Sequence, residues 1–290
     1  MLFPGFTQHR IATTSAEINF QRGGSGPPLL LLHGYPQTHA MWHKIAPSLA
    51  NRFTVIAADL RGYGDSSKPP SGPDHAAYSK RAMALDMVEL MAALGWSSFG
   101  LVGHDRGARV AYRLALDHPQ RVTRLVVLDI VPTYAVWHNL DKRRATAIYH
   151  WLFLIQPDHL PETMVGANPE YYLREKLKRW SMRPDAFDPD AVAEYIRCFS
   201  DPAAIHATCE DYRAGATIDL ELDEADYGKR KITCPVLALW GRRAIASEAG
   251  DVLESWRPWT TNVRGQAINS GHFLPEEAPA ETLSAIETFL

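Results

Sequence analysis

The chain has 290 residues, of which 46% are hydrophobic and 22% charged, and it carries a formal net charge of -3. This length and composition allow a large core, either in one large α/β domain or in two smaller ones. Because acidic and basic residues are interspersed, there is neither a basic stripe for nucleic acid nor a polybasic patch for a membrane surface, and we expect neither partner.

The N-terminal residues and the cysteines indicate where the protein works. The start, MLFPGFTQHR, lacks the long apolar run of a signal peptide, and nothing later reaches transmembrane length, so we expect a cytoplasmic protein. Cys198, Cys209 and Cys234 are odd in number and show no C-x-x-C spacing, which argues against disulfides and a zinc site. We expect these cysteines to be reduced residues of the core.

Short apolar runs alternate with helix-length segments through the first half of the chain. The runs are PPLLLLH (27–33), FTVIAAD (53–59), FGLVGH (99–104) and RLVVLD (124–129). Such runs are typical of buried parallel strands in βαβ units, so they predict an α/β fold with a doubly wound, mostly parallel sheet. The glycine-rich RGGSGPP (22–28) precedes a strand instead of joining a strand to a helix, and it predicts a hairpin turn instead of a phosphate-binding loop.

Helical patterns replace the strand pattern from Thr133 to Tyr227. The stretches are LDKRRATAIYHWLFL, NPEYYLREKLKRW and DPDAVAEYIRCF, and two of them open with Asn-Pro or Asp-Pro, as helices often do. Strands then resume at PVLALWG (235–241) and, more weakly, near NVRGQAINS, before a helix from Pro275. We predict an α/β core of residues 1–132 and 228–290. Residues 133–227 would form a helical cap over the strand ends, where open α/β sheets bind ligands.

The sequence VGHDRGAR (102–109) has the glycine spacing of the nucleophile elbow G-x-S-x-G, but an aspartate takes the place of the serine. In α/β-hydrolases, small residues around the nucleophile permit a sharp turn from a strand into a helix. The segment Gly103-His104-Asp105-Arg106-Gly107 places Asp105 at the apex of that turn. The sequence therefore predicts an α/β-hydrolase fold with Asp105 as its nucleophile.

Two further residues complete a catalytic set in the chain order nucleophile, acid, histidine. His272, in SGHFLPEE, follows the last predicted strand, where this order requires the base. Two places compete for the acid: Asp129 at the end of RLVVLD, and the loop after PVLALWG, which has no carboxylate before Glu248. We expect Asp129, although an aspartate at the end of a strand can also serve as a helix cap.

An aspartate nucleophile defines a two-step reaction. Its carboxylate is ionised at neutral pH and needs no base for its attack on carbon, which would give an alkyl ester of Asp105. His272, oriented by Asp129, would then activate water to attack the ester carbonyl. The oxyanion would form on Asp105 itself, within reach of the backbone N–H groups of Arg106 and of Tyr35 in the loop HGYP.

Two arginines, Arg106 and Arg109, follow the nucleophile and would share one face of its helix with Asp105. An anionic nucleophile repels an anionic substrate by several kcal/mol at ~4 Å when the effective dielectric constant is near 20. Guanidinium groups that hold a substrate carboxylate would remove this repulsion, so we expect small carboxylate substrates. The alternative is a pair of solvated helix arginines, which is what we expect of Arg113.

These motifs together resemble the fluoroacetate dehalogenases, α/β-hydrolases that convert fluoroacetate to glycolate and fluoride. The resemblance covers nearly the whole chain. Its most specific parts are GHDR with Arg109, the His-Trp pair of IYHWLFL, and DYRAG (211–215). One departure is Tyr35, because members of the family commonly have phenylalanine at this position; the additional hydroxyl could alter substrate preference.

The resemblance also implies roles for individual residues and a homodimeric assembly. The catalytic residues would be Asp105, His272 and Asp129, and the residues that bind the substrate carboxylate would be Arg106 and Arg109. The departing halide would be held by His150, Trp151 and Tyr212. Three N–H and O–H donors suit fluoride, a strongly hydrated leaving group, but without the resemblance these three side chains would be assigned to packing.

Two other functions stay open. An epoxide hydrolase also uses an elbow aspartate, with tyrosines such as Tyr149 and Tyr212 to protonate the epoxide oxygen, but a neutral epoxide needs no arginine clamp. A receptor on the same fold would bind a small molecule without chemistry, and the complete catalytic set argues against it. We expect no metal or organic cofactor, since water is the second substrate and the histidines lack a ligand spacing such as H-E-x-x-H.

Overall fold

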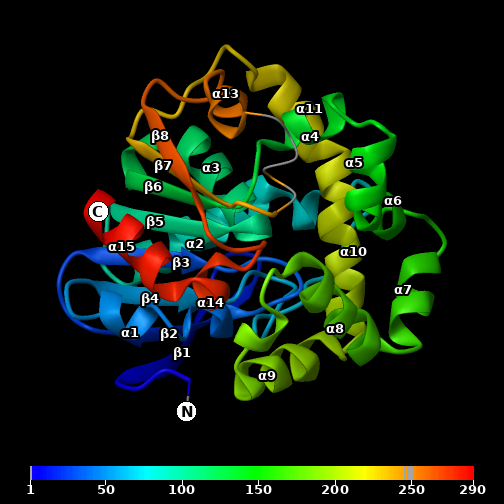
Figure 1. Ribbon diagram of the computed structural model, residues 1–290, viewed down its shortest axis with the longest axis horizontal. Coiled ribbons are helices and arrows are strands. Elements are labelled where there is room, and N and C mark those ends of the chain that lie inside the picture. The colour runs from blue at the N-terminus through cyan, green and yellow to red at the C-terminus, as the bar shows by residue number, and fades with distance from the viewer. Residues whose placement is uncertain (1, 245, 247–250) are drawn as a thin grey trace.

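The computed structural model describes residues 2–244, 246 and 251–290 (Figure 1). Within these residues the centre of the molecule is one eight-stranded sheet, with the order β1-β2-β4-β3-β5-β6-β7-β8. The strands are β1 (Phe6–Ala12), β2 (Glu17–Gly23), β3 (Pro28–Leu32), β4 (Thr54–Ala58), β5 (Phe99–His104), β6 (Val122–Leu128), β7 (Val236–Gly241) and β8 (Val263–Ile268). The pairs β1·β2 and β2·β4 are antiparallel, and all pairs from β4 to β8 are parallel. The predicted mostly parallel sheet is therefore confirmed.

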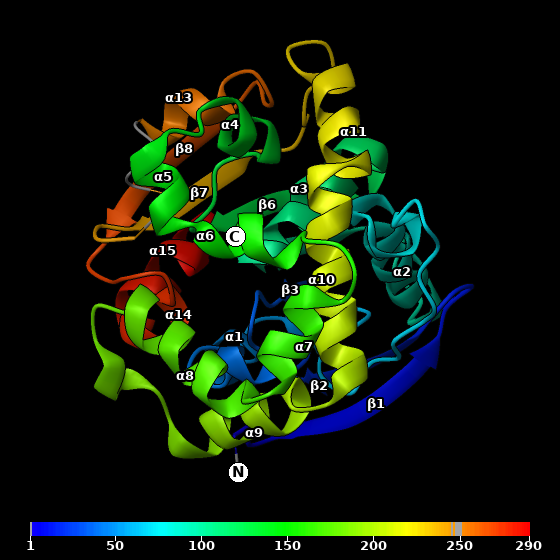
Figure 2. The same ribbon diagram turned by 90° about the vertical axis from the view of Figure 1, so that its right-hand side faces the viewer.

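The central parallel strands are apolar because helices cover both faces of the sheet. All five residues of β4 are buried, as are four of the five in β3. In Figure 2, α2 (Lys80–Ala93) and α3 (Asp105–Asp117) lie on one side of the sheet, and α14 (Leu274–Glu277) and α15 (Pro279–Phe289) on the other. Strands covered on both faces appear in the sequence as continuous apolar runs, which explains why these strands could be predicted.

The segment RGGSGPP does not form the predicted hairpin turn. It leads from β2 to β3, but these strands are not neighbours, because β4 lies between them in the sheet. The hairpin instead lies earlier, where β1 pairs with β2 in the register Ala12–Glu17 to Phe6–Gly23. The physical reason is the topology: β3 pairs with β4 and β5, which both come later in the chain, so its partners are not visible in the local turn signal.

A block of helices fills the chain between β6 and β7. Its members are α4 (Thr133–His138), α5 (Lys142–Ala147), α6 (Tyr149–Leu154), α7 (Leu160–Gly166), α8 (Pro169–Trp180), α9 (Pro189–Phe199), α10 (Pro202–Ala216) and α11 (Ile218–Asp226). Figure 1 shows these helices gathered at one end of the sheet, and in Figure 2 they face the viewer. The stretch from Leu140 to Leu154, predicted as one helix, is divided at Ile148 into α5 and α6. The division into a core and a cap stays a prediction.

The remaining helices are short connections and edge elements. They are α1 (Ala46–Leu49), α13 (Val252–Trp256) and the 3-10 turns η1 (His39–Trp42), η2 (Ala76–Tyr78), η3 (Pro119–Arg121) and η4 (Pro184–Ala186). In the described residues, no helix has both the length and the apolar character that a membrane span requires. The three cysteines are free and buried, as expected.

Candidate active site

The nucleophile elbow forms at the junction of β5 and α3. Asp105 is the first residue of α3 and has φ = +45°, a backbone conformation that residues other than glycine adopt only under constraint. The neighbouring glycines make the turn possible. A Cβ on Gly107 would lie 2.3 Å from the carbonyl oxygen of His33, and one on Gly103 would lie 2.6 Å from Cα of Ala108. Only glycines allow the strand and helix to approach this closely, as an elbow requires.

The carboxylate of Asp105 is held by the loop that follows β3. Its Oδ1 atom accepts a hydrogen bond of 2.9 Å from the backbone N–H of Tyr35. This is the geometry expected of the Tyr35 oxyanion donor, and Gly34 permits it, because a Cβ there would lie 2.5 Å from Cβ of Asp105. Burial acts to raise the pKa of Asp105, but the opposing effect of His272 and the nearby arginines is larger and lowers this pKa below its usual value. The ionised, nucleophilic form is therefore favoured.

His272 and Asp129 form a hydrogen-bonded pair beside Asp105. Asp129 Oδ2 lies 2.6 Å from Nδ1 of His272, and its Oδ1 accepts a hydrogen bond of 3.0 Å from the backbone N–H of Gly241. Nε2 of His272 forms no hydrogen bond within the described residues and lies 3.9 Å from Oδ2 of Asp105. Since Asp129 favours the proton on Nδ1, Nε2 is left as the basic nitrogen. The competing acid, Glu248, lies outside the described residues.

The pKa of His272 reflects two opposing influences. Burial acts to lower it, while the hydrogen bond and the charge of Asp129 raise it, and the net result is a pKa above the ordinary value of 6.5. Such a histidine is a stronger base than a free imidazole, which suits the activation of water.

The two arginines of the predicted clamp are buried but differ in their partners. Arg106 donates from Nε and Nη2 to the carboxylate of Asp211 in α10, and its Nη1 is buried without a partner in the described structure. Arg109 is 4% exposed and donates from Nη1 to the Val131 carbonyl and to Oγ1 of Thr133. Among the described residues Arg109 forms no ion pair. Its guanidinium therefore has no carboxylate within 4 Å in the described structure, although its charge interacts with that of Asp105 at longer range.

A small cavity of about 70 Å³ lies between Asp105, Asp129 and His272 on one side and the helical block on the other. A water molecule needs roughly 10–15 Å³ of such volume, so the cavity has room for a small molecule. Its walls include the following residues: Asp105, Arg109, Asp129, Ile130, Val131, Ala135, Val136, Arg144, Ala147, Ile148, His150, Trp151, Trp180, Ala246 and His272. Arg106 and Tyr212, both predicted site residues, lie behind this wall: Arg106 is 5.5 Å from the Trp151 ring centroid and 4.2 Å from that of Tyr212.

The three side chains implied to hold a halide converge from two helices. His150 and Trp151 lie on α6, and their ring centroids are 5.6 Å and 5.7 Å from that of Tyr212 on α10. In the described structure, Nδ1 of His150 and the hydroxyl of Tyr212 are buried without hydrogen-bond partners. Burial holds the pKa of His150 well below its usual range, so its ring is neutral and has one N–H to donate. The structure thus brings these three residues together beside the cavity, although it does not test their role.

The prediction that Arg113 is solvated is wrong, and Tyr149 becomes a weaker candidate for an acid that protonates an epoxide. Arg113 is not solvated: it is buried and forms ion pairs with Asp223 at 2.9 Å and with Asp226 at 2.7 Å, both in α11. Tyr149 was a candidate acid for an epoxide, but it is 39% exposed and its hydroxyl accepts a hydrogen bond of 2.7 Å from Lys176 instead of facing the cavity. Arg113 also pairs with Asp117, four residues along the same helix, at 3.4 Å, which is a local signal of pairing. Asp223 and Asp226 are distant in sequence, and no local signal could have revealed them.

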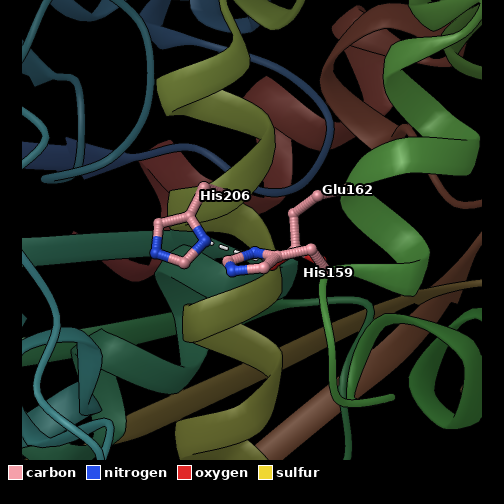
Figure 3. A group of neighbouring side chains, drawn as sticks. All are labelled: His159, Glu162 and His206. Atoms are coloured by element: carbon pink, nitrogen blue, oxygen red, sulfur yellow. Dashed lines mark hydrogen bonds and ion pairs between the residues drawn. The ribbon is translucent and has the colours of Figure 1, made fainter.

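One group of side chains in the described residues has the types and spacing to hold a metal ion. His159, Glu162 and His206 place their ligand atoms within 4.8 Å of one another (Figure 3). None of the three lines the cavity. Both oxygens of Glu162 also accept hydrogen bonds from Arg213, at 2.7 Å and 3.1 Å. The group is therefore accounted for as an ion-pair cluster that joins α7 to α10.

Comparisons with known proteins agree with this fold. The family model described as alpha/beta hydrolase fold matches residues 27–279. A fluoroacetate dehalogenase from a Burkholderia species is 47% identical over 290 residues, which is 100% of this chain and 95% of that protein. A soluble epoxide hydrolase from Corynebacterium sp. (strain C12) is 36% identical over 277 residues, 94% of this chain and 93% of that protein.

A solved structure is similar over the whole chain. The crystal structure of ALR0039 from Nostoc sp PCC 7120, which carries the provisional name alpha/beta hydrolase, is 63% identical with a TM-score of 0.98, and the match covers 100% of this chain and 99% of that one. The chain belongs to the α/β hydrolase fold family. Within that family its relatives include both a dehalogenase and an epoxide hydrolase, so the substrate has to be argued from the site.

Proposed function

We propose that the protein hydrolyses small 2-haloacids, with fluoroacetate as the leading substrate, to a 2-hydroxyacid and halide. The observation that carries the proposal is Arg109. Its guanidinium is buried in the wall of the cavity that contains Asp105, and it has no ion-pair partner among the described residues. An unpaired buried charge is costly to maintain, and a substrate carboxylate would neutralise it. The dehalogenase relative supports the same substrate class.

The first step would be substitution at carbon. Arg109, with Nη1 of Arg106 behind it, would hold the substrate carboxylate and orient the carbon that bears the halogen toward Asp105. Oδ2 of Asp105 would attack this carbon while Oδ1 stays on the Tyr35 N–H. A C–O bond forms as the C–halogen bond breaks, and the halogen leaves as halide with the bonding electron pair. At a chiral carbon the configuration inverts.

The departing halide would be stabilised by His150, Trp151 and Tyr212. Fluoride is strongly hydrated in water, and in a site with little water the protein has to supply the donors. The neutral His150 ring and the hydroxyl of Tyr212 are buried and have no other partner in the described structure, so both are available for this role.

The second step would hydrolyse the ester. Nε2 of His272 removes a proton from water as the water oxygen attacks the carbonyl carbon of the Asp105 ester. The negative charge then lies on the carbonyl oxygen of Asp105, near the Tyr35 N–H. Collapse of this intermediate releases the 2-hydroxyacid, whose oxygen recovers the proton from His272. The second proton of the water is left on the carboxyl group of Asp105, and its release to solvent regenerates the carboxylate.

Epoxide hydrolysis is the second candidate, and the buried hydroxyl of Tyr212 favours it. This hydroxyl has no hydrogen-bond partner in the described structure and could donate a proton to an epoxide oxygen. The 36% identical epoxide hydrolase supports the same reading. Arg109 argues against it, because a neutral epoxide would leave the buried guanidinium without a counter-charge.

The test is the release of halide from fluoro-, chloro- and bromoacetate, measured by ion chromatography beside the hydrolysis of styrene oxide. We expect halide release by the wild type, none by Asp105→Ala, and accumulation of an alkylated protein by His272→Asn, detected by intact-protein mass spectrometry. Hydrolysis of styrene oxide without halide release would establish the second candidate instead. An unmodified mass for His272→Asn after incubation with substrate would contradict the two-step reaction.

A further inference from the structure

The loop that carries His272 is fastened by one buried carboxylate. Glu277, in α14, is 2% exposed, and its Oε1 accepts a hydrogen bond of 3.0 Å from the backbone N–H of Phe273. Its Oε2 accepts one of 3.0 Å from the N–H of Gly271. The two residues that flank His272 in the chain are therefore both bonded to the same side chain.

The same carboxylate also accepts hydrogen bonds from the backbone of the segment that follows α8. Oε2 of Glu277 accepts hydrogen bonds from the backbone N–H groups of Met182, at 2.7 Å, and Arg183, at 3.0 Å. The N–H of His272 in turn donates to the carbonyl of Trp180, the last residue of α8, at 2.8 Å. Because Trp180 lines the cavity, these bonds tie the position of His272 to the wall that the helical block contributes.

The bonding pattern requires a carboxylate at this position. Within the described residues, all four hydrogen bonds that the Glu277 side chain accepts come from backbone N–H groups, and a carboxylate has only acceptors to offer. A glutamine would place its carbonyl oxygen where three N–H groups meet and its NH2 group against the N–H of Phe273. Two donors would then face each other directly after His272, and the hydrogen bond from the Phe273 N–H could not form.

We propose that Glu277 is a positioning residue that holds His272 at the distance needed for ester hydrolysis; this inference rests on the proposed function. Nδ1 of His272 is fixed by Asp129, but a ring pivoting about that single bond could move Nε2 relative to the ester. The bonds from Glu277 to both neighbours of His272 remove this freedom. Glu277 acts on the second step alone, because Asp105 needs no base for its attack on carbon.

The test compares Glu277→Gln with Glu276→Gln, using fluoroacetate or chloroacetate, whichever releases halide from the wild type. Glu276 is equally buried but bonds the side chains of Gln37 and Tyr195 instead of the histidine loop. Burial raises its pKa to about 8, so the neutral amide of Glu276→Gln resembles the protonated form that predominates at pH 7. In this control variant, the rate of alkylation of Asp105 and the rate of ester hydrolysis should both stay within about twofold of the wild type.

For Glu277→Gln we expect kcat and KM to fall together, on the order of 10- to 100-fold, with kcat/KM nearly unchanged, because a displaced base slows the second step alone. Rapid quenching followed by mass spectrometry should show the ester of Asp105 as the main enzyme form. A lower kcat/KM without ester, or unchanged kinetics, would overturn the proposal. If the wild type releases no halide and His272→Asn forms no ester, it is the proposed function that fails.

A second variant covers the case in which Glu277→Gln does not fold. A Cβ on Gly271 would lie 2.5 Å from the backbone nitrogen of Met182 and 2.5 Å from the carbonyl oxygen of Trp180, so Gly271→Ala pushes apart the same junction without changing a charge. We expect Gly271→Ala to accumulate the ester as well. Loss of alkylation and hydrolysis to the same extent in this variant would count against a role confined to His272.

Discussion

Asp211 holds the guanidinium of Arg106 by two hydrogen bonds to its carboxylate, 2.9 Å from Nε and 2.7 Å from Nη2. Nη2 also donates to the Asp211 carbonyl at 2.6 Å. The same carboxylate is bonded by Tyr63 and by Lys80, so two cations share one acid. These bonds leave Nη1 as the guanidinium nitrogen of Arg106 that has no hydrogen-bond partner in the described structure. Asp211 is thus the residue that fixes the second arginine of the proposed clamp.

Asp211→Asn should destabilise the protein strongly. The substitution leaves Arg106 buried without its counter-charge and leaves Lys80 with Asp219 alone, 3.6 Å away. Breaking a buried pair in this way costs about 3–5 kcal/mol in the free energy of unfolding. Urea denaturation followed by circular dichroism measures this cost. Asp65→Asn is the matched control, because Asp65 pairs with the half-exposed Arg197 and its loss should cost about 0–1 kcal/mol. If both variants lost the same free energy of unfolding, burial would not be what makes the ion pairs of Asp211 stronger than that of Asp65.

Arg109→Gln should weaken substrate binding but stabilise the free protein. The free protein no longer buries an unpaired charge, so its melting temperature should rise, while KM for the haloacetate should increase by roughly 10- to 150-fold as a charged hydrogen bond is removed. Acetate, an unreactive anion, should raise the melting temperature of the wild type but not of the variant. Thermal denaturation with and without acetate tests both statements. A stabilising effect of acetate on Arg109→Gln would place the anion site elsewhere.

The two chemical steps should respond differently to pH. His272 has a pKa raised above 6.5, chiefly by Asp129 against the effect of burial, and it must be neutral to act as a base. As pH falls through this raised pKa the base is protonated, so ester hydrolysis should fall about tenfold for each further unit. Asp105, with a pKa below 3.8, stays ionised, and alkylation continues.

Samples quenched across a pH series should therefore show more ester of Asp105 at acid pH, as mass spectrometry can measure. Loss of alkylation and hydrolysis in parallel near neutral pH would mean that His272 also serves the first step.

The sequence contained most of the parallel sheet but not its antiparallel edge. The runs around β3 to β6 are continuous and apolar, since both faces are covered. β1 has the sequence FTQHRIA, and none of its residues is fully buried, so it lacks the apolar run on which the prediction depended. Its place in the sheet is set by seven paired residues of β2 instead. An edge strand of this kind is determined by its partner more than by its own hydrophobicity.

The candidate site, like the sheet, could be predicted only in part from the sequence. Asp105, Asp129 and His272 could be selected from the sequence because each follows a strand in a recognisable local context, and the structure brings all three together. The bonds that orient them come from distant segments. Asp211 lies 105 residues beyond Arg106, and the Met182 N–H comes from 95 residues before Glu277. Such partners are chosen by the packing of helices against the sheet, for which a single sequence gives no periodic signal.

The glycines of the elbow should tolerate no side chain. In Gly107→Ala the new Cβ would lie 2.3 Å from the His33 carbonyl oxygen and 2.5 Å from that of Leu32, both fixed in the backbone. We expect α3 to shift away from the sheet, so that the hydrogen bond from the Tyr35 N–H to Asp105 is lost. Halide release should fall at least tenfold, and overpacking should lower the free energy of unfolding by about 1–3 kcal/mol.

Gly166→Ala provides the control, since its Cβ would meet only Ile205, at 3.9 Å, at the end of α7. That variant should be as active as the wild type and up to about 1 kcal/mol more stable, because alanine restricts the unfolded chain. Urea denaturation and halide release measure both, and wild-type activity in Gly107→Ala would refute the view that close contact between β3 and α3 sets the position of the nucleophile.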